Sequence, residues 1–174
     1  MNWEEVLRLH QGARELFKEN ASAVPRETWS KAAEDQWSPA HITEHVVLVY
    51  KVMLDELNGG KGMVIRTGFV RRNFLRLFMV PGLLHGKPFP KGARAPRETR
   101  PARINENQID AVVEFEKLSL QFENAARKAY ERNRQTQLTH AYFGRADLVK
   151  SMQLCARHVL HHANMMTHLK ATAR

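Results

Sequence analysis

The sequence has a single cysteine, Cys155, and no apolar run that approaches the length of a membrane span. One cysteine excludes an intramolecular disulfide and a cysteine-rich zinc cluster, so any metal must be held mainly by nitrogen and oxygen. A transmembrane helix needs about 20 mostly apolar residues. The start of the chain, MNWEEVLRLH, carries acids where a signal peptide has a basic start and a long apolar segment. We therefore expect a cytoplasmic protein with no membrane partner.

The chain also has fewer acids than bases, with 18 Asp and Glu against 27 Lys and Arg. The formal net charge is +9 and the pI is near 10.1. Much of the excess lies in residues 81–107, a segment rich in proline and glycine that we interpret as a long basic loop. Such a loop suits an anionic ligand, nucleic acid or an acidic partner, and it equally suits a solvated surface with no partner. Its charged residues are Lys87, Lys91, Arg94, Arg97, Arg100 and Arg103 against Glu98 and Glu106.

Apolar residues recur at helical spacing in four long segments, and no segment shows the sustained alternation of a strand. Ser38 and Pro39 suit the N-cap and first position of the second helix, and Asn105 with Gln108 resembles a capping box for the third. The predicted helices cover residues 2–20, 39–58, 105–132 and 147–172, with a short basic amphipathic helix over 68–79 that ends before Pro81 and Gly82. We predict an all-α four-helix bundle, formed by a single domain of residues 1–174, with the 81–107 loop as a crossover.

The clearest chemical signal lies in residues 147–169, where His158 and His162 are four residues apart. On a helix this spacing places both imidazoles on one face, and Cys155 and Met166 continue the same stripe. A stripe of this kind faces the core. Two buried imidazoles without partners would each cost about 1 to 3 kcal/mol, so we expect something to bind them, and a metal would satisfy both.

A third ligand is available on the second helix. His45 lies on the apolar stripe of that helix, whereas His41 in its first turn is expected to be exposed. In a bundle His45 can meet His158 and His162 across the core, which gives three nitrogen ligands and open positions for water. The alternative is that the histidines hydrogen-bond one another, the backbone or water. His161 is rotated by about 100° from its neighbours and does not belong to this group.

Two motifs follow one another along the chain: Trp37-Ser38-Pro39 before His45, and Tyr142-Phe143-Gly144 before His158, His161 and His162. This arrangement resembles the DinB-like metalloprotein superfamily, which includes the YfiT-type metal-dependent hydrolases. The resemblance extends from Trp37 to about His168. It implies a four-helix bundle that binds a divalent metal, often nickel or zinc, through His45, His158 and His162. One position departs from the pattern, because Met165 stands where family members commonly carry a glutamine that could contact a ligand or substrate.

The resemblance implies either hydrolysis or transfer chemistry with a low-molecular-weight thiol. We favour a thiol S-transferase acting on a small molecule as a homodimer, with the basic loop recruiting an anionic thiol or substrate. A non-catalytic, stress-related metal-binding module is the alternative. A nucleic-acid-binding protein that uses residues 66–103 is disfavoured, because no nucleic-acid motif is present.

Candidates for a catalytic group are weak. Glu116 interrupts the apolar stripe of the third helix, so it could act as a buried base or simply pair with a basic residue. Cys155, one turn before His158, could be a reactive thiol, a fourth ligand or a packed side chain. Among the other histidines, we expect a satisfied, half-buried ring at His10, an exposed one at His85, and capping or packing by His140.

Overall fold

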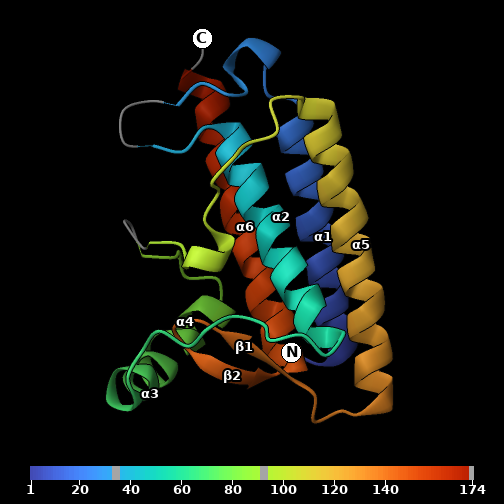
Figure 1. Cartoon of the computed structure of the whole chain (residues 1–174), viewed down its shortest axis with the longest axis vertical. Helices are drawn as coiled ribbons and strands as arrows, with labels where there is room; N and C mark the ends of the chain where they lie inside the picture. The colour runs from blue at the N-terminus through green and yellow to red at the C-terminus, as the bar shows by residue number, and fades with distance from the viewer. Residues whose placement is uncertain (33–35, 91–93, 173–174) are drawn as a thin grey trace.

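Four long helices form a bundle, which confirms the predicted fold class (Figure 1). The computed structural model describes residues 1–32, 36–90 and 94–172, and side chains up to Thr167. The bundle helices are α1 (Trp3–Ser22), α2 (Pro39–Leu57), α5 (Gln108–Arg132) and α6 (Leu148–Thr172). α1 packs mainly along α6, and α2 packs mainly along α5. None of the described helices is both long and apolar enough to cross a membrane.

The helix starts follow from local hydrogen bonds. Asn2 and Glu5 form a capping box at α1, and the Ser38 hydroxyl accepts from the amide of His41 at α2, where Pro39 takes the first position. The cap of α5 is Asn107, whose side chain accepts from two backbone amides, so the predicted cap at Asn105 is wrong by two residues. At α6, Oδ1 of Asp147 accepts from the amide of Lys150 at 2.9 Å, as expected for an N-cap.

The hairpin and the two short helices lie beside one end of the bundle (Figure 1) and differ from the prediction in two ways. An antiparallel hairpin, β1 (Gln137–His140) and β2 (Gly144–Asp147), was not expected. Four-residue strands are too short for alternation to show, and Gly144 has a φ of 73° that closes the turn. The short helix α3 (Phe69–Phe78) is present, but Pro81 does not stop helical structure, because it lies in the first turn of α4 (Val80–Leu84).

The basic segment 81–107 is not a uniform loop. It begins inside α4 and contains the 3₁₀ turn η2 (Arg97–Thr99), which packs against α2. Thr99 in this turn is fully buried. Residues 91–93 of the segment, and with them Lys91, lie outside the described residues. A second 3₁₀ turn, η1 (Arg26–Thr28), follows α1.

Candidate metal centre

Three histidines meet where α2 faces α6. Nε2 of His158 lies 3.2 Å from Nε2 of His45 and 3.1 Å from Nε2 of His162. The ligand atoms of the three residues all lie within 4.8 Å of one another. His45 and His162 are buried, and His158 is partly exposed. The structure therefore brings together the three residues that the sequence nominated, two from adjacent turns of α6 and one from a helix about 110 residues earlier.

The contact made by Nδ1 of His45 decides which of its two nitrogens carries the proton. Nδ1 of His45 lies 2.6 Å from the carbonyl oxygen of Thr99, which can only accept, so Nδ1 carries the proton. Nε2 of His45 is then a bare lone pair directed at His158. A backbone carbonyl that orients a ligating imidazole in this way is common at metal sites. Thr99 therefore positions the ring, and no sequence pattern marked it.

Neutral rings cannot satisfy both contacts of His158 with ordinary hydrogen bonds. If Nε2 of His158 is protonated, it donates to His45 but cannot accept from His162. If it is bare, it accepts from His162 but faces the lone pair of His45. An extra proton is disfavoured, because burial holds the pKa of His158 and of His162 well below the usual value and lowers that of His45. A cation shared by three lone pairs removes the conflict.

The observed spacing also fits a metal. Nitrogen ligands at about 2.0–2.1 Å from a tetrahedral ion lie about 3.3 Å apart, close to the two Nε2 separations in this cluster. Nδ1 of His162 is a buried nitrogen without a hydrogen-bond partner among the described residues. The nearby Met165 packs partly buried against the core. The cluster thus has the donor set for a divalent ion, and His162 is a buried ligand that lacks an orienting hydrogen bond.

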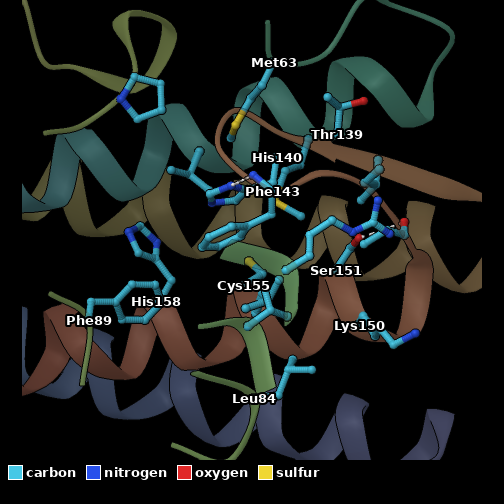
Figure 2. Close-up of a pocket in the computed structure, with 18 of the residues that line it drawn as sticks. Met63, Leu84, Phe89, Thr139, His140, Phe143, Lys150, Ser151, Cys155 and His158 are labelled. Atoms are coloured by element: carbon cyan, nitrogen blue, oxygen red, sulfur yellow. Dashed lines mark hydrogen bonds between the residues drawn. The ribbon is translucent and has the colours of Figure 1, made fainter. Parts of the chain in front are cut away.

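A pocket of about 360 Å³ opens beside His45 and His158 (Figure 2). Its wall is mostly apolar and comes from α2, α4, the hairpin and α6. Two cationic side chains, Arg76 and Lys150, belong to the lining, and no carboxylate does among the described residues. Other lining residues include Val49, Met63, Leu84, Phe89, Leu138, Phe143 and Leu154. A pocket of this kind suits a small, largely apolar molecule, with a place for a negative charge.

His140 lies on the hairpin and lines the same pocket. Its Nδ1 accepts from the backbone amides of Tyr142 and Phe143, at 3.2 and 3.4 Å, and its ring stacks on Phe143. The expectation of capping and packing is therefore confirmed. Burial lowers the pKa of His140 to about 4, so the ring is neutral at pH 7.

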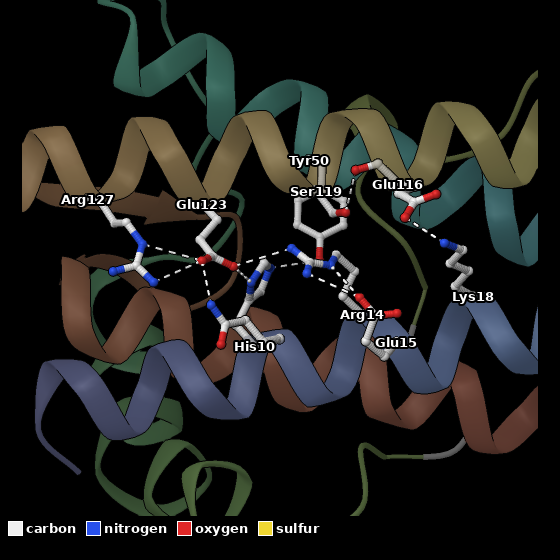
Figure 3. A network of polar contacts seen from close by, with 10 residues as sticks. His10, Arg14, Glu15, Lys18, Tyr50, Glu116, Ser119, Glu123 and Arg127 are labelled. Atoms are coloured by element: carbon white, nitrogen blue, oxygen red, sulfur yellow. Dashed lines mark hydrogen bonds and ion pairs between the residues drawn. The ribbon is translucent and has the colours of Figure 1, made fainter.

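The two candidates for a catalytic group have different environments. Cys155 lines the pocket, but it is buried against the Tyr50 hydroxyl, and burial raises the pKa of its thiol to about 12. A thiol in this state packs rather than reacts. Glu116 lies on α5, half-exposed, with its carboxylate 2.6 Å from Nζ of Lys18 (Figure 3). It is not in the pocket lining, so the pairing interpretation holds and a role as base at this pocket is not supported.

The remaining histidines lie outside the cluster. His10 is fully buried rather than half-buried, and both its nitrogens have partners, Glu123 and Tyr50. His85 is exposed, as expected. His41 is partly buried and its Nδ1 contacts the Ser38 hydroxyl at 2.7 Å, so the expected exposure is only partial. His161 is partly exposed, and the side chain of His168 lies outside the described residues.

Comparison with known proteins extends the fold assignment. No family model and no curated protein matches the sequence. The crystal structure of the mycothiol-dependent maleylpyruvate isomerase aligns with a TM-score of 0.62 and 15% identity, over 94% of this chain and 60% of that one. YfiT from Bacillus subtilis, described as a probable metal-dependent hydrolase with an unusual four-helix bundle topology, aligns with a TM-score of 0.61 and 10% identity, over 99% of this chain and 90% of that one.

This chain therefore spans about three fifths of the isomerase and most of YfiT. At such identities the similarity concerns the fold. It agrees with the resemblance that the two sequence motifs indicated, and the three histidines and the pocket are features of this chain itself. The chain has the four-helix bundle fold of YfiT and of the mycothiol-dependent isomerase.

Proposed function

We propose that this protein is a metal-dependent enzyme that holds a divalent ion, nickel or zinc, with His45, His158 and His162. The observation that carries the proposal is the convergence of three Nε2 atoms whose hydrogen bonds cannot all be made by neutral rings. An ion held by three neutral imidazoles supplies a Lewis acid that lowers the pKa of water or of a thiol. The pocket beside the cluster favours catalysis over metal storage.

The reaction we propose is S-transfer with a low-molecular-weight thiol, with hydrolysis as the second candidate. One structural neighbour is named as a mycothiol-dependent isomerase, which supports a thiol, and the other as a probable metal-dependent hydrolase. The substrate is a small molecule with an apolar body and a negative charge. Arg76 and Lys150 attract that charge, and the apolar wall keeps water away from the reacting groups.

The first test is the metal content of protein purified without a histidine tag. We expect close to one divalent ion per chain in the wild type and loss of most of it in each of His45→Ala, His158→Ala and His162→Ala, because two nitrogens hold the ion far more weakly than three. His161→Ala is the matched control, since it removes a neighbouring imidazole on the same helix. Metal content that is unchanged in the three variants would refute the site.

The second test separates the candidate reactions. Metal-loaded and metal-free protein are compared in single-turnover conjugation of an electrophile with a panel of thiols, and in hydrolysis of ester and amide substrates without thiol. Acceleration that needs both metal and thiol supports S-transfer, and acceleration by metal alone supports hydrolysis. A protein that holds its metal and accelerates neither reaction is the non-catalytic binding module.

A further inference from the structure

Exposed large hydrophobic side chains are concentrated on α3 and just before it. None of its ten residues is buried. Seven of the eleven large hydrophobic side chains that are exposed in the described residues fall within residues 64–78. They are Val64 (58% exposed), Ile65 (39%), Phe69 (71%), Val70 (81%), Phe74 (60%), Leu77 (68%) and Phe78 (66%). We call the five of these side chains that lie on α3, with Arg71 and Arg76, the α3 surface.

The α3 surface has an apolar sector with an arginine at each edge. At about 100° per residue, the five exposed apolar side chains of α3 occupy a sector of about 180°, interrupted by Asn73. Arg71 stands at one edge of this sector and Arg76 at the other. The opposite side of the helix, through Leu75, packs against the small cluster around Leu83. Figure 1 shows α3 beside the end of the bundle, and its apolar sector is exposed.

The excess positive charge of the chain falls in the sequence segment that contains this surface. Residues 57–97 contain nine Lys and Arg and no Asp or Glu, a number equal to the formal net charge of the whole chain. The remaining residues are therefore neutral in sum. Arg66 is paired with Glu98 at 2.9 Å, whereas no ion pair is found for Arg71 or Arg76 within the described residues. This surface therefore has the charge and the apolar side chains to suit an anionic partner with an apolar region.

We propose that the α3 surface docks on an anionic phospholipid bilayer. The phenylalanines and Leu77 enter the headgroup region, while Arg71 and Arg76 meet lipid phosphates. A helix of this type lies along the interface and does not span the membrane. The lack of a long apolar run led us to expect no membrane partner, but a helix that lies on the surface needs no such run. Because Arg76 also lines the pocket, docking places the pocket close to the membrane surface.

Two other partners fit the surface less well. A second copy related by a two-fold axis would bring identical patches together, so the arginines of one α3 would lie near those of the other. A nucleic acid supplies phosphates, but its backbone offers no apolar region for Val70 or Leu77 to enter. A bilayer surface supplies both the negative charge and the apolar depth.

The test is cosedimentation of the full-length protein with phosphatidylcholine vesicles, with and without phosphatidylglycerol. We expect binding that requires phosphatidylglycerol and weakens at least tenfold between about 0.1 and 0.5 M NaCl, because salt screens the contribution of the arginines. The double variant Phe74→Ser, Phe78→Ser should lose at least tenfold in affinity. Its matched control is Ile109→Ser, Val113→Ser, which removes two equally exposed apolar side chains from α5.

Two charge-reversal variants test how much the arginines contribute to vesicle binding. We expect vesicle affinity to fall at least tenfold in the double variant Arg71→Glu, Arg76→Glu. The matched control is the double variant Lys117→Glu, Lys128→Glu, which makes the same change in net charge at exposed positions of α5. It should have a small effect. Circular dichroism and metal content verify that each variant is folded. Absent binding, or binding equal for both vesicle types, overturns the proposal. It is also overturned if the phenylalanine variant abolishes dimerisation or oligonucleotide binding instead of vesicle binding.

Discussion

The hydrogen bond from Nδ1 of His45 to the carbonyl of Thr99 decides which nitrogen of His45 faces the cluster. Because Thr99 is in a 3₁₀ turn of the basic segment, the backbone of that segment, and not its charge, acts on the site directly. His162 has no equivalent contact at its Nδ1. Of the two buried ligands, His45 is therefore the better oriented, and we expect it to dominate the geometry of the site.

Cys155 provides a prediction at the scale of one residue. Cys155 is 4% exposed and burial raises the pKa of its thiol to about 12, so very little thiolate forms near neutral pH. Alkylation of the native protein by iodoacetamide at about pH 8 should be at least 100-fold slower than alkylation of the urea-unfolded chain, as followed by mass spectrometry. Cys155→Ala should keep its metal. Rapid alkylation of the native thiol, or metal loss in Cys155→Ala, would instead restore Cys155 as a nucleophile or ligand.

At the scale of elements, a buried polar network joins α1, α2 and α5 (Figure 3). Glu123 of α5 accepts from Nδ1 of His10 at 3.2 Å and from Arg14 at 3.4 Å, while Arg127 reaches it from the next turn at 3.0 Å. His10 in turn contacts the Tyr50 hydroxyl of α2 at 2.9 Å. Burial acts to raise the pKa of Glu123, but hydrogen bonds from His10, Gln11 and Arg127 lower it to about 2.

Removing the charge of Glu123 should therefore loosen the bundle. We expect Glu123→Gln to lower the free energy of unfolding by about 2 to 4 kcal/mol, because the buried charges and donors around it lose their common partner. Urea denaturation at neutral pH measures the change. Glu116→Gln on the same helix breaks a half-exposed pair and should cost less than about 1 kcal/mol. Equal costs for both variants would mean that the network contributes no more than a surface ion pair.

At the scale of the molecule, the buried and partly buried histidines around the pocket make stability depend on pH. In the unfolded chain histidines have a pKa near 6.5. Burial lowers the pKa of His140 to about 4 and lowers those of His45, His158 and His162 as well. Between these values the unfolded state binds more protons than the folded state, so the free energy of unfolding falls as pH falls. The metal-free protein should therefore lose stability below about pH 6.5.

The contribution of His140 can be separated by substitution. His140→Asn retains an acceptor for the amides of Tyr142 and Phe143 but does not titrate. Between about pH 6.5 and 4 its unfolding free energy should decline by up to about 3 kcal/mol less than that of the wild type. Urea denaturation of metal-free protein across this range gives the comparison, with His85→Gln as the exposed control. An identical decline in all three proteins would show that His140 does not contribute.

The sequence by itself determined the features that depend on residues close together in the chain. Four apolar stripes of helical period predicted the bundle, and the i, i+4 spacing placed His158 and His162 on one face because the turn of a helix is local. The cap at Ser38 was predictable for the same reason. His45 could be predicted as the third ligand because it lies on the apolar stripe of α2, and the motif resemblance supported this prediction.

Only the tertiary structure decided the features that depend on distant segments. Thr99, His140 and the apolar wall reach the cluster through η2, the hairpin and α4, whose positions no local period encodes. The spacing in α3 predicted an amphipathic helix, but amphipathicity states only that one face avoids water and not what covers it. In the folded chain no core covers that face, because α3 packs beside the bundle rather than in it.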